Sequence, residues 1–128
     1  MARDIVNVQL PVQDATASIE IKAFEKTTVA PANGVEIAKA LDNKNNSLVI
    51  VIEPTTAGTV TIKAGNAYPN AMLGDLNVTP TAGQVNAILL EDIARFENRD
   101  GSVNIDFADG FAGTIYAVAK RAGFRTEY

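Results

Sequence analysis

The stretch Thr59-Val-Thr-Ile-Lys-Ala64 alternates strictly between polar and apolar side chains. A β-strand points successive side chains to opposite faces, so this alternation predicts a strand with one buried face and one face in water. Residues 5–10, 18–23 and 103–107 alternate in the same way. One wet face per strand is typical of antiparallel sheets. The repeated pattern therefore predicts an antiparallel, all-β protein.

Turn-forming residues divide the chain at short intervals, as at Asn33-Gly34, Gly65-Asn66, Asp100-Gly101 and Asp109-Gly110. Gly and Asn accept the positive φ that tight turns need. The runs between these turns are rich in Val, Ile, Thr and Phe. Many short strands of this kind predict a β-sandwich or jelly roll of about eight or nine strands.

One strand candidate is apolar on both of its faces, and it consists of Leu48, Val49, Ile50, Val51 and Ile52. Such a strand has to be covered on both sides. We expect it either at the centre of the sandwich or in a subunit interface, and the segment 113–119 is similar. These five residues are the candidate interface strand.

The segment 84–96 fits two structures. Its apolar residues lie close to helical spacing, the run from Thr81 to Gln84 resembles a capping box, and Glu91 and Arg95 form an i,i+4 pair. The local signal therefore favours one short helix near 84–96 added to the sheet. A strand that ends in a turn is the alternative, and residues 34–41 are equally ambiguous.

The chain has 128 residues, which is the size of one domain, and we expect a single domain over 1–128 with extended tails at both ends. The absence of Cys and His excludes disulfides, thiolate metal sites, His-ligated zinc and Ser-His-Asp triads. The net charge of −4 gives no reason to expect nucleic-acid binding. No apolar run approaches the roughly 20 residues of a membrane helix, and Asp4 near the start argues against a signal peptide.

No phosphate-binding glycine motif is present, and the acidic residues are the remaining candidates for chemistry. Six carboxylates gather within about twenty residues, a grouping that is compatible with calcium or with an acid/base pair. An EF-hand register centred on Gly101 places Phe96 and Phe107 at ligand positions, where neither can bind a cation. We therefore expect a solvated surface, no catalytic, cofactor or metal residues, and no enzyme.

Basic residues are concentrated at the ends of this acidic chain, namely Arg3, Lys120, Arg121 and Arg125. Termini of a domain often lie close together, which predicts one positive patch that docks onto an acidic partner. The alternative is a solvated tail.

Among the aromatic residues, Tyr68 beside Pro69 is the one candidate platform for a sugar ring, with packing in the core or loop as the alternative.

The chain resembles small β-rich virion proteins of tailed bacteriophages, which are head decoration, cement or head-fibre components. The resemblance covers roughly residues 33–122 and rests on Gly58-Thr-Val-Thr-Ile-Lys-Ala-Gly-Asn66, Gly74-Asp-Leu-Asn-Val-Thr79, Ala94-Arg-Phe96, Asp100-Gly-Ser-Val-Asn-Ile-Asp106 and Gly113-Thr-Ile-Tyr-Ala-Val118. In such relatives, the stretch that matches 84–91 looks like a strand followed by a turn, which favours a strand here.

The resemblance implies a structural protein that binds the outer face of an expanded capsid and clamps neighbouring subunits together. Its partner would be the major capsid protein, it would form a homo-oligomer (a trimer or dimer), and it would reach the capsid exterior after synthesis in the host cytoplasm. A tail or fibre-base component and a carbohydrate-binding β-sandwich module are the alternatives. An exposed aromatic platform would favour the sugar-binding module, whereas an exposed aliphatic patch or strand edge would favour assembly.

Overall fold

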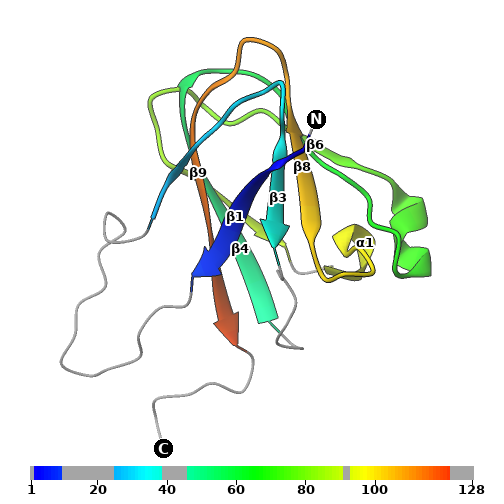
Figure 1. Ribbon diagram of the computed structural model, residues 1–128. Helices are drawn as coiled ribbons and strands as arrows, with labels where there is room; N and C mark the ends of the chain where they lie inside the picture. The colour runs from blue at the N-terminus through cyan, green and yellow to red at the C-terminus, as the bar shows by residue number, and fades with distance from the viewer. Residues whose placement is uncertain (1, 10–24, 39–45, 91–92, 122–128) are drawn as a thin grey trace, which may run out of the picture.

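The computed structural model describes residues 2–9, 25–38, 46–90 and 93–121 (Figure 1). These ranges contain nine strands and two short helical segments. The strands are β1 (Asp4–Gln9), β2 (Thr27–Thr28), β3 (Val35–Ala38), β4 (Asn46–Thr56), β5 (Val60–Ile62), β6 (Leu76–Val78), β7 (Asn86–Leu90), β8 (Val103–Phe107) and β9 (Ala112–Arg121). The helical segments are the 3₁₀ helix η2 (Pro69–Leu73) and the four-residue helix α1 (Ile93–Phe96). The all-β prediction is confirmed.

The strands form one curled, mixed sheet with the order β6-β5-β8-β3-β1-β9-β4-β7, and β2 pairs with β9 beside this path. β1 is hydrogen-bonded to β3 on one side and to β9 on the other, so it joins two halves of the sheet. Because a single hydrogen-bonded path connects all of these strands, the expectation of a two-sheet sandwich or jelly roll is not confirmed.

The direction of β1 differs from the antiparallel expectation. Its pairings with β3 and β9 are both parallel, while every other pairing among the described strands is antiparallel. The period-2 alternation reports which face of a strand is buried, and it carries no information on the direction of the neighbouring strands. The parallel register places Val8 beside Ala117.

The core lies between the inner faces of the two halves, which the curl of the sheet brings together. The half built on β3, β5 and β8 contributes Val35, Ile37, Val60, Ile62, Val103 and Ile105, all with no exposed surface. The half built on β4 and β9 contributes Leu48, Ile50, Ile52, Ile115 and Ala117, which are equally buried. Each large side chain contributes roughly 1.5–3 kcal/mol by leaving water.

The strand that was expected to be covered on both sides lies inside the sheet. β4 is paired with β9 along one edge and with β7 along the other. Leu48, Ile50 and Ile52 point into the core, whereas Val49 and Val51 point to the outer face. The edge of this half of the sheet is β7, not β4.

The segment 84–96 forms a strand followed by a short helix, so the helical interpretation of its first part is wrong. Ile50 pairs with Ile88 and Leu48 with Leu90, and these pairs supply a sheet partner that the local sequence does not reveal. The Asn86 side chain accepts a hydrogen bond from the backbone N–H of Thr81 and donates to the Thr81 and Gln84 carbonyl oxygens, which fixes a loop where a capping box was expected. The ambiguous segment 34–41 contains strand β3.

Candidate functional site

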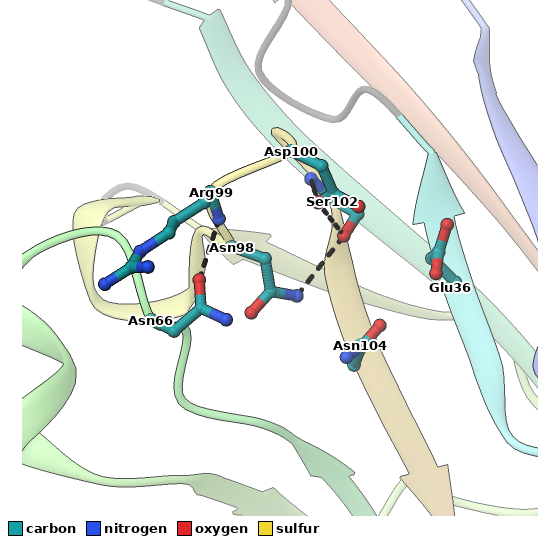
Figure 2. A pocket seen from close by; sticks show the side chains of 7 residues that line it. All are labelled: Glu36, Asn66, Asn98, Arg99, Asp100, Ser102 and Asn104. Atoms are coloured by element: carbon teal, nitrogen blue, oxygen red, sulfur yellow. Dashed lines mark hydrogen bonds between the residues drawn. The ribbon is translucent and has the colours of Figure 1, made fainter.

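A polar pocket of about 360 Å³ opens on the outer face of the β3–β8 half of the sheet (Figure 2). Val103 and Ile105 point into the core, so Asn104 between them faces outward, and the buried Ser102 just before β8 lines the same pocket. Glu36 on β3 is the direct cross-strand partner of Asn104. The turn after α1 and the loop after β5 complete the wall with Asn66, Asn98, Arg99 and Asp100.

Hydrogen bonds hold one wall of this pocket in place. The Asp100 carboxylate accepts hydrogen bonds from the Ser102 hydroxyl (2.6 Å) and the Ser102 backbone N–H (3.0 Å). The same two bonds, the hydroxyl first, lower the pKa of Asp100, so this carboxyl is ionised at neutral pH. Asn98 donates from Nδ2 to the Ser102 hydroxyl at 3.3 Å, and Asn66 Oδ1 accepts the Arg99 backbone N–H at 2.8 Å.

Three groups in the pocket have unused hydrogen-bonding capacity. Within the part of the chain that the structure describes, the Glu36 carboxylate and the Arg99 guanidinium form no side-chain hydrogen bond or ion pair. The buried Oδ1 of Asn104 also accepts no hydrogen bond there. Figure 2 shows Glu36 and Asn104 on one side of the pocket and Asn66 and Arg99 on the other. The pocket therefore presents acceptors on one side and a cationic donor on the other.

A second pocket, of about 420 Å³, lies between β2, β4, β9 and the loop before β7, and it is less suited to a polar ligand. Its charged groups, Lys26 and Glu53, neutralise each other in an ion pair of 2.8 Å. Tyr116 lies next to this pair with 1% of its surface exposed, and its burial, followed by the charge of Glu53, raises its pKa. This pocket leaves no unpaired charge among its described lining residues.

The outer face of the other half of the sheet is aliphatic at the β7 edge. Val49 is the cross-strand partner of both Leu89 and Val118, so the three side chains share this face, and Ala87 follows on β7. We call these four residues the outer aliphatic face. Leu89 is 52% exposed, and Val85, which precedes β7, is also exposed. The β3–β8 half is charged instead, with the ion pairs Arg3–Asp106 and Lys63–Asp75.

The predicted single basic patch does not form between Arg3 and the basic residues of β9. Arg3 donates a hydrogen bond to the Ile105 carbonyl oxygen at 3.0 Å and forms an ion pair with Asp106. Lys120 and Arg121 lie at the far end of β9, where they pair with Ser47 and Asn46. Because β1 and β9 are parallel with Val8 beside Ala117, Arg3 and Arg121 are separated by about 30 Å of strand length. Arg125 lies outside the described residues.

The remaining candidate from the sequence, Tyr68, lies on the surface just before η2 and lines neither of the two pockets. Its exposed neighbours on η2, Met72 and Leu73, are aliphatic. Sequence reasoning missed the polar pocket. The outward position of Asn104 followed from the alternation of residues 103–107, but no local signal indicates that Glu36 pairs opposite Asn104 or that Asn66 lies beside Arg99.

Comparisons with protein-family models, curated proteins and solved structures find no significant match to this chain. In the ranges that the structure describes, no group of three or more His, Cys, Asp or Glu side chains is arranged to hold a metal ion. Among those same residues, no helix has the length and apolar character needed to cross a membrane.

Proposed function

We propose that this chain is a structural protein of a bacteriophage virion that binds the outer surface of the capsid and stabilises the shell, without enzymatic activity. Its partner is the major capsid protein, and it acts as a homo-oligomer, a dimer or trimer. Two lines of support combine here: the resemblance of residues 33–122 to phage head proteins, and the character of the exposed surface.

The observation that carries the proposal is the outer aliphatic face beside the edge strand β7. Single exposed apolar residues are ordinary on a soluble protein. Here Leu89, Val49 and Val118 adjoin one another across three neighbouring strands. Among the described strands, β7 has no partner on its other side, so its backbone groups also face outward. An aliphatic surface next to an open strand edge is typical of a protein–protein contact.

The two rival classes have less support. A sugar-binding module that uses an aromatic platform needs aromatic rings around a groove, and Tyr68 lines neither pocket. An enzyme with paired carboxylates needs one acid with a raised pKa beside one that stays ionised. The carboxyl pKa values that are shifted among the described residues, those of Asp75 and Asp100, are both lowered. The alternative of a tail or fibre-base component has the same surface chemistry, and the identity of the bound partner distinguishes it.

A small docking surface is sufficient for a decoration protein because the capsid is a repeating lattice. When the copies within an oligomer bind neighbouring capsid subunits, the second contact becomes intramolecular, and the overall affinity rises without any new contact. A few aliphatic side chains per copy therefore suffice for stable attachment.

The test compares Leu89→Glu with Ile5→Glu. Both side chains are apolar and 52% exposed, but Ile5 lies on β1 away from the β7 edge. Binding is measured by co-sedimentation with expanded capsids of the same phage that lack this chain. We expect Leu89→Glu to abolish binding and Ile5→Glu to leave it intact, with both variants folded by circular dichroism. Equal binding by both variants contradicts docking through the outer aliphatic face, and failure of the unmodified chain to bind any capsid overturns the proposed function.

A further inference from the structure

We propose that the polar pocket formed by Glu36, Asn66, Asn98, Arg99, Ser102 and Asn104 binds a neutral saccharide. This inference is independent of capsid attachment, because the pocket lies on the charged half of the sheet and the outer aliphatic face lies on the other half. Its volume of about 360 Å³ is near the lower end of the range for small-molecule sites, which is about 300–1,000 Å³.

The chemistry of the lining selects a ligand with many hydrogen-bonding groups. Three amides, one hydroxyl, two carboxylates and one guanidinium line the pocket, and no aromatic or large apolar side chain does. Carboxylates only accept hydrogen bonds, guanidinium groups only donate, and amides do both. A sugar hydroxyl also donates and accepts, so a run of hydroxyl groups matches this mixed wall.

Two of the unused groups, on Glu36 and Asn104, lie side by side in the pocket, and the Arg99 side chain lies across from them. Glu36 is a free acceptor beside Asn104, whose Oδ1 lacks a hydrogen bond, and both lie on neighbouring strands of the rigid sheet. Arg99 lies on the opposite side, with its backbone fixed by the bond from its N–H to Asn66 Oδ1. Adjacent hydroxyl groups of a sugar ring can donate to the Glu36 carboxylate, which has no other partner among the described residues.

The charges disfavour other ligand classes. The two carboxylates, Glu36 and Asp100, outnumber the single guanidinium, so a phosphate or another anion is repelled on balance. A divalent cation needs several oxygen ligands that converge on one point. Asp100 is already occupied by the Ser102 hydroxyl and N–H, and the positive Arg99 lines the same pocket. A neutral, polyhydroxylated ring is not repelled by the carboxylates and does not require several oxygen ligands to converge on one point.

The experiment titrates the full ¹⁵N-labelled chain with glucose, galactose, rhamnose and N-acetylglucosamine at millimolar concentrations and follows the backbone amide signals. We expect at least one sugar to shift the signals of residues 98–104 and of Asn66 and Glu36, with saturation. Glu36→Gln removes one acceptor charge while conserving shape, and it is expected to weaken binding about ten- to hundredfold. Glu25→Gln, at an exposed glutamate outside the pocket, is the matched control and leaves binding unchanged.

Three outcomes overturn the inference. The first is the absence of a saturable shift with every sugar. The second is a shift that maps elsewhere, for example around Tyr68. The third is that calcium chloride alone shifts the pocket signals and competes with the sugar, which identifies a cation site. Leu89→Glu is expected to bind the sugar normally, so failure of saccharide binding and failure of capsid binding are distinguished in separate assays.

Discussion

Arg3 forms an ion pair with Asp106, which lies two strands away in the sheet, and its guanidinium group passes over Gly34 between them. The same guanidinium donates to the Ile105 carbonyl oxygen. A Cβ atom on Gly34 would lie 2.5 Å from Arg3 Nη1 and 3.0 Å from the Ile105 oxygen. The Arg3 side chain therefore links the start of β1 to β8, and it crosses position 34 at a point where only glycine leaves room for it.

Gly34→Ala is expected to destabilise the protein by more than Gly101→Ala. Both glycines have positive φ, +70° and +85°, so both substitutions carry a backbone cost of about 1–2 kcal/mol. A Cβ on Gly101 meets no atom within 4 Å, whereas one on Gly34 displaces Arg3. Urea denaturation of both variants gives the two free energies of unfolding. Equal losses would show that the Arg3 contact contributes nothing.

Ile50→Ala is expected to lower the free energy of unfolding by about 2–5 kcal/mol, because it leaves a cavity in a fully buried part of the core. Val49→Ala, on the next residue of β4, removes a half-buried side chain of the outer aliphatic face and is expected to cost less. Thermal unfolding followed by circular dichroism compares the two. A larger loss for Val49→Ala would mean that the inner and outer faces of β4 are assigned the wrong way round.

The Asp75 carboxylate makes stability depend on pH in the acidic range. It accepts hydrogen bonds from the Ala64 N–H at 2.7 Å and from Lys63 Nζ at 2.8 Å, and these contacts lower its pKa, the Ala64 bond most strongly. A lowered pKa means that the stabilisation is complete above the ordinary carboxyl pKa of about 4 and is lost as the pH falls through the folded-state pKa.

Asp75→Asn is therefore expected to flatten the decline in stability below about pH 4. At neutral pH the loss should be small, about 0.2–1 kcal/mol, because the pair with Lys63 lies at the surface, with 39% and 33% of the two side chains exposed to screening by solvent. Urea midpoints from pH 2 to pH 7 provide the measurement. Asp109→Asn, at an exposed turn residue with no hydrogen bond among the described residues, is the control. The same acid profile for Asp75→Asn and the unmodified chain would exclude this linkage.

The separation of Arg3 from the end of β9 predicts different effects for their charge reversals. Arg3→Glu is expected to reduce stability, since it repels Asp106 and removes the bond to Ile105.

If Lys120 and Arg121 contact an acidic capsid surface, their replacement by Glu weakens capsid binding and flattens its salt dependence while stability is retained. Binding at low and physiological salt checks this. Unchanged binding by the Lys120→Glu, Arg121→Glu variant would leave the outer aliphatic face as the contact.

The alternation of side chains was sufficient to predict the buried faces of several strands. In β8, the alternation of apolar and polar residues from Val103 to Phe107 gives the burial that the structure has, with Ser102 as an additional buried residue at its start. The apolar run in β4 indicated a strand at the centre of the fold or in a subunit interface, and the structure pairs it with β7 and β9. Such predictions succeed because the period of side-chain direction is a local property of the extended backbone.

The segment before α1 shows where local information was insufficient. Residues 84–90 have helical spacing and a cap-like start, yet Asn86–Leu90 form β7. Leu48 and Ile50 of β4 pair with Leu90, which is buried, and with Ile88, which is partly buried against the core. Packing against an apolar neighbour outweighs propensity differences of a few tenths of a kcal/mol per residue. The partner strand lies more than 30 residues away in the sequence, so the local pattern of residues 84–90 does not indicate it.

The sequence by itself determined that the chain is β-rich, that it has no Cys or His for catalysis or metal binding, and that the strand around residues 48–52 is apolar on both of its faces. Only the tertiary structure decided that β1 is parallel to both of its neighbours, that Arg3 forms an ion pair with Asp106, and that Glu36 lies beside Asn104 in the polar pocket. Hydrophobic alternation constrains each strand separately. The order and direction of strands, and therefore every site built from two of them, depend on contacts between residues far apart in the chain.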